Sequence, residues 1–132
     1  MTKKHKSDPR GWGDATKLVR GGTNRTQHGE TSEALFLTQG FVYDNPEEAE
    51  ARFDGSEPGF IYSRFSNPTV AMFERRMCAL EGAEAARATA SGMAAVTAAL
   101  MGVVRAGDHV VAAQALFGSC RWVIEEWLPR FG

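Results

Sequence analysis

The sequence has no hydrophobic run long enough to cross a membrane, no marked excess of either charge and few cysteines. Its longest nearly apolar stretch covers residues 93–104, whereas a spanning helix needs about 20 apolar residues. The net charge of −1 excludes a general electrostatic attraction to nucleic acid or to an anionic membrane. We therefore expect neither a membrane nor a nucleic acid as a partner.

The only cysteines, Cys78 and Cys120, lack the close spacing of a redox or zinc motif. We expect free thiols, no metal site and a reducing compartment. The basic first residues are not followed by the apolar segment of a secretory signal, so we expect a cytoplasmic location. With 43% hydrophobic and 23% charged residues, the 132-residue chain has the composition and length of about one globular domain.

The first half of the chain is irregular. Residues 1–16 combine charge with proline and glycine, and we expect a disordered basic tail there. Residues 17–65 mix turn residues with short apolar pieces, which indicates an extended N-terminal arm. Within this arm, Asn45 can cap a short helix that Pro46 opens and Gly55 ends.

The second half, residues 66–132, is more regular. Asn67 and Pro68 begin a helix whose apolar residues recur at helical spacing up to Gly82. Ser91 can cap an alanine-rich helix that ends near residues 105–107, and a last helix starts near Arg121.

Strands are expected between these helices. Residues 108–113, "DHVVAA", have the pattern of a short buried strand. Residues 84–90, which precede the second helix, are expected to form the other strand. The alternation of helices and strands predicts an α/β fold with a parallel or mixed sheet flanked by helices. Because a parallel sheet needs more than two strands, we expect the chain to be the incomplete N-terminal part of a larger domain.

Three features could bind a planar phosphorylated molecule. If residues 60–65 are extended, Tyr62 and Arg64 point to one side and can share an anion. At the following helix start, the Ser91 hydroxyl and the free amides of Gly92 and Met93 offer a second set of donors. Phe117 follows the strand 108–113 and could stack on a flat ring.

Each feature alone also has an ordinary structural explanation. Tyr62 and Arg64 could be solvated surface residues, Ser91 could be only a helix cap, and Phe117 could belong to the core. Their order along 56 residues is what favours a site for a phosphorylated aromatic cofactor.

The segments "YSRFSNPT", "ATASGMAA", "AGDHVV" and "LFGS" closely resemble the Cys/Met-metabolism family of pyridoxal phosphate (PLP) enzymes, from about Leu18 to Gly132. The resemblance implies a fold-type I, aspartate aminotransferase-like large domain. It also implies that Tyr62 and Arg64 reach the phosphate of a neighbouring subunit's PLP. By the same resemblance, Gly92 and Met93, with the Ser91 hydroxyl beside them, match the backbone donors to the phosphate of their own subunit's PLP, and Phe117 matches the residue stacked on the pyridine ring.

The resemblance is greatest to the branch of the family that acts on O-succinylhomoserine and sulfide. It implies a γ-replacement that forms homocysteine in methionine biosynthesis, with Tyr62 as the one visible candidate for a catalytic role. Relatives with these motifs are homo-oligomers, usually dimers of dimers. A cystathionine γ-synthase or a γ-lyase of the same family is the first alternative.

PLP enzymes hold the cofactor through a lysine. All lysines of this chain, at positions 3, 4, 6 and 17, lie in the tail or the start of the arm. We therefore expect the full-length parent to be the enzyme and the 132 residues alone to be inactive. A catalytically inert truncated anion-binding fragment is the alternative from another class.

Overall fold

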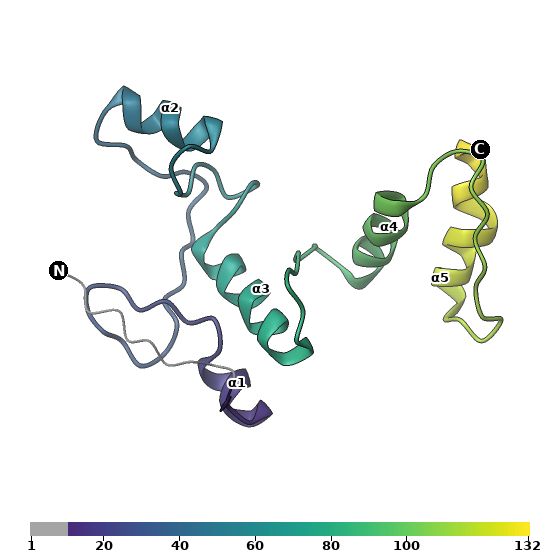
Figure 1. The fold of residues 1–132 in the computed structure, drawn as a ribbon, viewed down its shortest axis with the longest axis horizontal. Coiled ribbons are helices and arrows are strands. Elements are labelled where there is room, and N and C mark those ends of the chain that lie inside the picture. Colours follow the sequence, from purple (N-terminus) through teal and green to yellow (C-terminus); the bar gives the residue numbers. More distant parts are fainter. Residues whose placement is uncertain (1–10) are drawn as a thin grey trace. The chain divides into compact units, whose positions relative to one another are not determined.

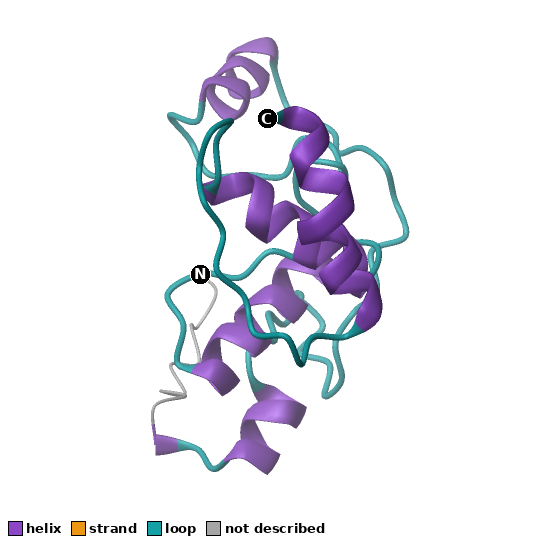
Figure 2. Ribbon diagram, turned by 90° about the vertical axis from the view of Figure 1, so that its right-hand side faces the viewer, coloured by secondary structure: helices purple, strands orange, loops and turns teal. Residues whose placement is uncertain are grey.

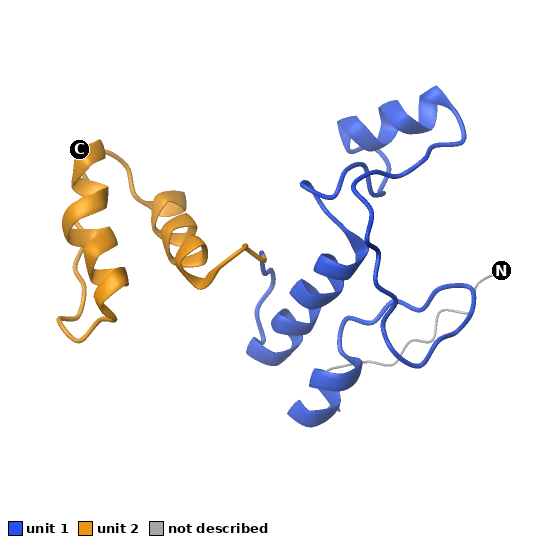
Figure 3. Ribbon diagram, turned by 180° about the vertical axis from the view of Figure 1, so that it is seen from behind, with its two compact units in different colours: residues 1–87 blue, residues 88–132 orange. Residues whose placement is uncertain are grey.

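The computed structural model describes residues 11–132, and the chain divides into two compact units. The first unit ends at Arg87 and the second runs from Ala88 to Gly132 (Figure 3). This division falls inside the segment 66–132, which the sequence predicts to be a single part of one domain. Each unit is described by itself below.

The described part of the first unit contains three α-helices, labelled in Figure 1: α1 (Asp14–Arg20), α2 (Pro46–Asp54) and α3 (Pro68–Glu81). The last two begin and end where the sequence predicts. Asn45 and Asn67 cap their first turns, a proline opens each helix, and a left-handed glycine follows each one. Helix α1 packs against α3.

Helix α1 corrects the sequence prediction for its region. Residues 14–16 were expected to be disordered and residues 17–20 extended, yet both belong to one helix. Lys17 donates to Asp14 across one helical turn at 3.1 Å. Helix α3 supplies the contact surface that a seven-residue amphipathic segment needs, because such short helices are marginal alone. The rest of the predicted tail, residues 1–10, lies outside the described residues.

The turn after α1 lies directly on α3. Gly22 has a φ of +72°, and a Cβ added there would lie 2.4 Å from the Met72 carbonyl oxygen. Arg76 of α3 donates to the Gly21 carbonyl oxygen at 2.9 Å and forms an ion pair with Glu33 at 2.8 Å. The buried Met72 and this arginine therefore fix residues 21–33 against the helix.

The second unit contains α4 (Gly92–Val103) and a longer helical region formed by α5 (Gly118–Trp122), the π-helical turn η2 (Val123–Trp127) and the 3₁₀ turn η3 (Leu128–Phe131). The region ends in the tighter turn that contains Pro129, as the sequence predicts for its last helix. Val123 is buried, and the rings of Trp127 and Phe131 meet edge to face at 5.2 Å. Within residues 11–132, no helix combines the length and apolar character needed to cross a membrane.

The two expected strands are not formed in the described part of the chain. Residues 84–90 and 108–113 carry no strand pairing, and the ribbon in Figure 2 consists of helices and loops. A strand is stable only when a neighbour accepts and donates its backbone hydrogen bonds, and Val111 remains 87% exposed. An isolated antiparallel bridge joins Gly40 and Tyr62. The arrangement of the predicted sheet thus stays a prediction.

Candidate functional site

The segment that carries Tyr62 and Arg64 is a tight turn. The Tyr62 carbonyl oxygen accepts from the amides of Phe65 at 2.9 Å and Ser66 at 3.2 Å. Extended geometry was expected here, and that expectation is wrong. Alternation of side chains in a strand therefore cannot be the reason why Tyr62 and Arg64 meet.

Arg64 nevertheless lies beside Tyr62. Its guanidinium carbon is 5.7 Å from the centre of the Tyr62 ring and 4.5 Å from that of Phe65. Cation–π contacts at exposed sites contribute roughly 0.5–1 kcal/mol, enough to bias the arginine toward the tyrosine. Both side chains are exposed, and Arg64 has no ion pair among the described residues. A phenol and an uncompensated guanidinium thus face solvent together.

Asn67 holds this turn in place. It is the buried polar residue of the first unit, with 6% of its surface exposed. Its side-chain oxygen accepts from the Thr69 amide at 2.9 Å, which caps α3. Its side-chain nitrogen donates to Ser63 Oγ at 2.9 Å and to the Phe36 carbonyl oxygen at 3.0 Å.

Ser63 extends the same network to residues 36–40. Its amide donates to the Gln39 carbonyl oxygen at 2.8 Å, and its hydroxyl donates to the Thr38 carbonyl oxygen. Thr69 Oγ1 accepts from the Phe36 amide at 2.9 Å. The sequence analysis did not identify Ser63 and Thr69, and it gave Asn67 only its capping role. The signal that could have identified them is the clustering of the short polar residues Ser63, Asn67 and Thr69 around the proline that opens α3.

A second support comes from α2. Arg52 donates to the Phe60 carbonyl oxygen at 3.4 Å, forms a short ion pair with Glu48 and places its guanidinium 5.4 Å from the centre of the Tyr43 ring. Glu48 also accepts from the Asp44 amide at 2.7 Å, and this hydrogen bond is the main reason that the pKa of Glu48 lies below its ordinary value. Arg52 therefore holds the backbone at Phe60, just before the turn, while Asn67 holds the turn itself through Ser63.

The start of α4 offers a different kind of anion site. Ser91 Oγ accepts from the Ala94 amide at 3.1 Å, as expected of a helix cap. No protein acceptor among the described residues binds the amides of Gly92 and Met93. A Cβ added at Gly92 would meet no atom within 4 Å, so the approach to these amides is open. Free amides at the positive end of a 12-residue helix suit an anion such as phosphate.

Phe117 occupies the N-cap position of α5 and is 74% exposed. Burial in the core of the second unit, the ordinary explanation for this ring, therefore does not apply in the structure. Its carbonyl oxygen accepts from the Arg121 amide at 3.0 Å, which fixes the backbone while the ring stays free.

The six predicted site residues divide between the units. Tyr62 and Arg64 belong to the first unit, whereas Ser91, Gly92, Met93 and Phe117 belong to the second. In the structure Arg64 lies beside Tyr62, and Ser91, Gly92 and Met93 lie together at the start of α4. The assembly of all six into one site remains a prediction.

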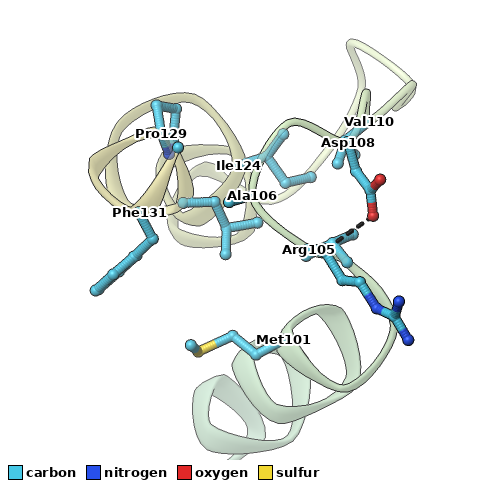
Figure 4. A pocket seen from close by; sticks show the side chains of 11 residues that line it. Met101, Arg105, Ala106, Asp108, Val110, Ile124, Pro129 and Phe131 are labelled. Atoms are coloured by element: carbon cyan, nitrogen blue, oxygen red, sulfur yellow. Dashed lines mark hydrogen bonds between the residues drawn. The ribbon is translucent and has the colours of Figure 1, made fainter.

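None of the six residues lines the cavity of about 360 Å³ in the second unit. Figure 4 shows its mainly apolar side chains, among them Met101, Ile124 and Phe131, around the end of α4 and the last helical turns. The Asp108 carboxylate at its edge already accepts from the Arg105 amide at 2.7 Å.

The family model described as "Cys/Met metabolism PLP-dependent enzyme" matches residues 15–132. O-succinylhomoserine sulfhydrylases of Mycobacterium tuberculosis and Pseudomonas aeruginosa are 51% and 48% identical over 96% of this chain. The chain spans about 31% of the length of each of these relatives.

A crystal structure from Campylobacter jejuni, named as an O-acetylhomoserine (thiol)-lyase with a pyridoxyl-lysine monophosphate, matches 92% of this chain with a TM-score of 0.85 and 31% identity. The chain covers 30% of that protein. Together with the family match, this similarity supports the fold class of the PLP-dependent Cys/Met-metabolism enzymes for the chain.

Proposed function

The chain belongs to the Cys/Met-metabolism family of PLP-dependent enzymes, and we propose that it forms the N-terminal part of an O-succinylhomoserine sulfhydrylase. The observation that supports this most strongly is the identity of about one half, over nearly the whole chain, to relatives of that name. The reaction is a γ-replacement in which sulfide displaces succinate from O-succinylhomoserine and homocysteine is formed.

The donors of the chain fit the phosphate of PLP. Arg64 supplies a permanent positive charge, the Tyr62 hydroxyl a hydrogen-bond donor, and the start of α4 two free amides with the Ser91 hydroxyl beside them. Charge-assisted hydrogen bonds contribute roughly 1.5–3 kcal/mol each, so several of them bind a dianion firmly. Phosphate binding is therefore the role of Tyr62, Arg64, Ser91, Gly92 and Met93 in this proposal.

Phe117 supplies the flat apolar surface. Its exposed ring at the first turn of α5 suits stacking on the pyridine ring of the cofactor. A phenylalanine provides area and shape without a hydroxyl, so it orients the cofactor and transfers no proton.

PLP, when bound, acts as the electron sink for carbanions formed next to its imine carbon. The residues of this chain bind and orient it, and Tyr62 additionally holds a proton near the substrate through its hydroxyl. The four lysines lie at positions 3, 4, 6 and 17, so the covalent attachment belongs to a lysine elsewhere in the full-length parent. The parent is an oligomer in which Tyr62 and Arg64 serve the site of a neighbouring subunit.

The test uses the protein translated from the complete reading frame. Purified protein should show the visible absorption of bound PLP and should form homocysteine from O-succinylhomoserine and sulfide. Efficient use of cysteine instead of sulfide would identify a cystathionine γ-synthase, and breakdown of substrate without a nucleophile a γ-lyase. PLP binding without any turnover would support the inert anion-binding alternative and overturn the proposed activity.

A further inference from the structure

Asn67 does more than begin a helix. Its side-chain oxygen caps α3. Its side-chain nitrogen donates to the carbonyl oxygen of Phe36, which is distant in the sequence, and to the hydroxyl of Ser63, which belongs to the turn. The side chain therefore joins three segments: residues 36–40, the turn that carries Tyr62 and Arg64, and the first turn of α3.

Asn45 provides an internal comparison. It precedes Pro46 as Asn67 precedes Pro68, and its oxygen accepts from the Glu48 amide at 2.8 Å. Yet Asn45 is exposed, and no contact of its side-chain nitrogen occurs in the described part of the chain. Capping thus needs only the oxygen, and the burial and amide contacts of Asn67 require a further explanation.

We infer that Asn67 is a positioning residue, whose amide latches the turn of Tyr62 and Arg64 to residues 36–40 so that these two side chains are held ready for an anionic ligand. The inference rests on the proposed function, because the ligand in question is the phosphate of PLP. Asn67 itself is buried, and its side chain is engaged by the turn and by α3, so its effect on a ligand passes through the turn.

The physical reason is the entropy of a short exposed turn. The Arg64 side chain has several freely rotating bonds, and its backbone lies inside the turn that the Phe65 and Ser66 amides close on the Tyr62 carbonyl oxygen. A backbone that is ordered only upon binding loses conformational entropy at that step, which lowers ligand affinity. The bonds from Asn67 and Ser63 to residues 36–39 order this turn before the ligand arrives.

Asn67→Asp separates the two roles of the residue. Aspartate caps helices as well as asparagine does, but it has no amide hydrogens for Ser63 and Phe36. In the full-length protein we expect at least about tenfold weaker PLP affinity, because both hydrogen bonds that the amide nitrogen donates are lost from a buried position. In the PLP-free protein, hydrogen exchange at the Ser63 and Phe36 amides should become at least about tenfold faster. Asn45→Asp, the matched control, should change neither quantity.

Equal PLP affinity in wild type and Asn67→Asp, with a folded variant, would overturn the inference. Were Asn67→Asp not to fold, Ser63→Ala would decide, because it removes the hydroxyl that Asn67 contacts and keeps the cap. Like Asn67→Asp, Ser63→Ala should weaken PLP binding and accelerate hydrogen exchange in the turn. If Ser63→Ala changed neither quantity, the inference would also be overturned. If the wild-type protein binds no PLP but the differences in hydrogen exchange appear, the proposed function is wrong, whereas the ordering of the turn by Asn67 is supported.

Discussion

The guanidinium of Arg64 lies 5.7 Å from the ring of Tyr62 within one tight turn, and both side chains are exposed. The contact places a fixed positive charge beside a phenol, and no carboxylate of the described residues 11–132 forms an ion pair with it.

Arg64→Ala should weaken PLP binding by the full-length protein about 10- to 100-fold, because one or more charge-assisted hydrogen bonds to the phosphate are lost. Arg20→Ala is the matched control, since Arg20 is an exposed arginine at the end of α1. PLP titration monitored by absorbance measures both variants. An affinity of Arg64→Ala equal to that of Arg20→Ala would remove Arg64 from the phosphate site.

Tyr62→Phe should lower kcat more than it lowers PLP affinity. The variant keeps the ring that Arg64 lies against and removes only the hydroxyl, which the proposal places near the reacting substrate. Loss of general acid–base help typically costs 10²- to 10⁴-fold in rate. Steady-state kinetics together with PLP titration separates the two effects, and an equal loss of both would contradict a chemical role.

Gly22→Ala should destabilise the first unit clearly more than Gly29→Ala does. Both glycines have a positive φ, which costs a residue with a Cβ roughly 1–2 kcal/mol. Only at Gly22 would the new Cβ also press on a backbone atom, the Met72 carbonyl oxygen at 2.4 Å, whereas nothing lies within 4 Å at Gly29. Overpacking adds on the order of 1–3 kcal/mol. Denaturant unfolding of both variants tests this, and similar losses would show that the close approach of Gly22 is unimportant.

Glu30 should contribute to stability above pH 4.5 and lose that contribution in acid. Its pKa lies below the ordinary value of 4.5, mainly because the Thr26 amide donates to the carboxylate and secondly because the Thr26 hydroxyl does. A carboxyl whose pKa is lowered by folding stabilises the fold above its unfolded pKa, and the effect disappears as the pH falls through the folded pKa.

Thr26→Val tests this directly, because it removes the hydroxyl donor and keeps the amide. The pKa of Glu30, followed by the NMR shift of its carboxyl carbon, should rise part of the way toward 4.5. A Glu30 pKa that does not move in this variant would show that the hydroxyl bond is absent in solution.

Local sequence signals were sufficient for three of the helices. Asn45 with Pro46, Asn67 with Pro68 and Ser91 mark the first turns of α2, α3 and α4, and Gly55 and Gly82 mark two of the ends. Capping and left-handed termination depend on residues within one turn of each other. The motifs containing Tyr62, Arg64 and Ser91 also identified the family before any geometry was available.

Contacts between distant segments decided the rest. Helix α1 forms against α3, the turn at Tyr62 is held by the Asn67 amide, whose partner Phe36 lies 31 positions earlier, and the segment 108–113 has no partner strand among the described residues. The sequence alone thus determined where α2, α3 and α4 start and which family the chain belongs to. Only tertiary structure determined how the turn presents Tyr62 and Arg64, because hydrogen bonds and packing between remote segments leave no periodic signal in the chain.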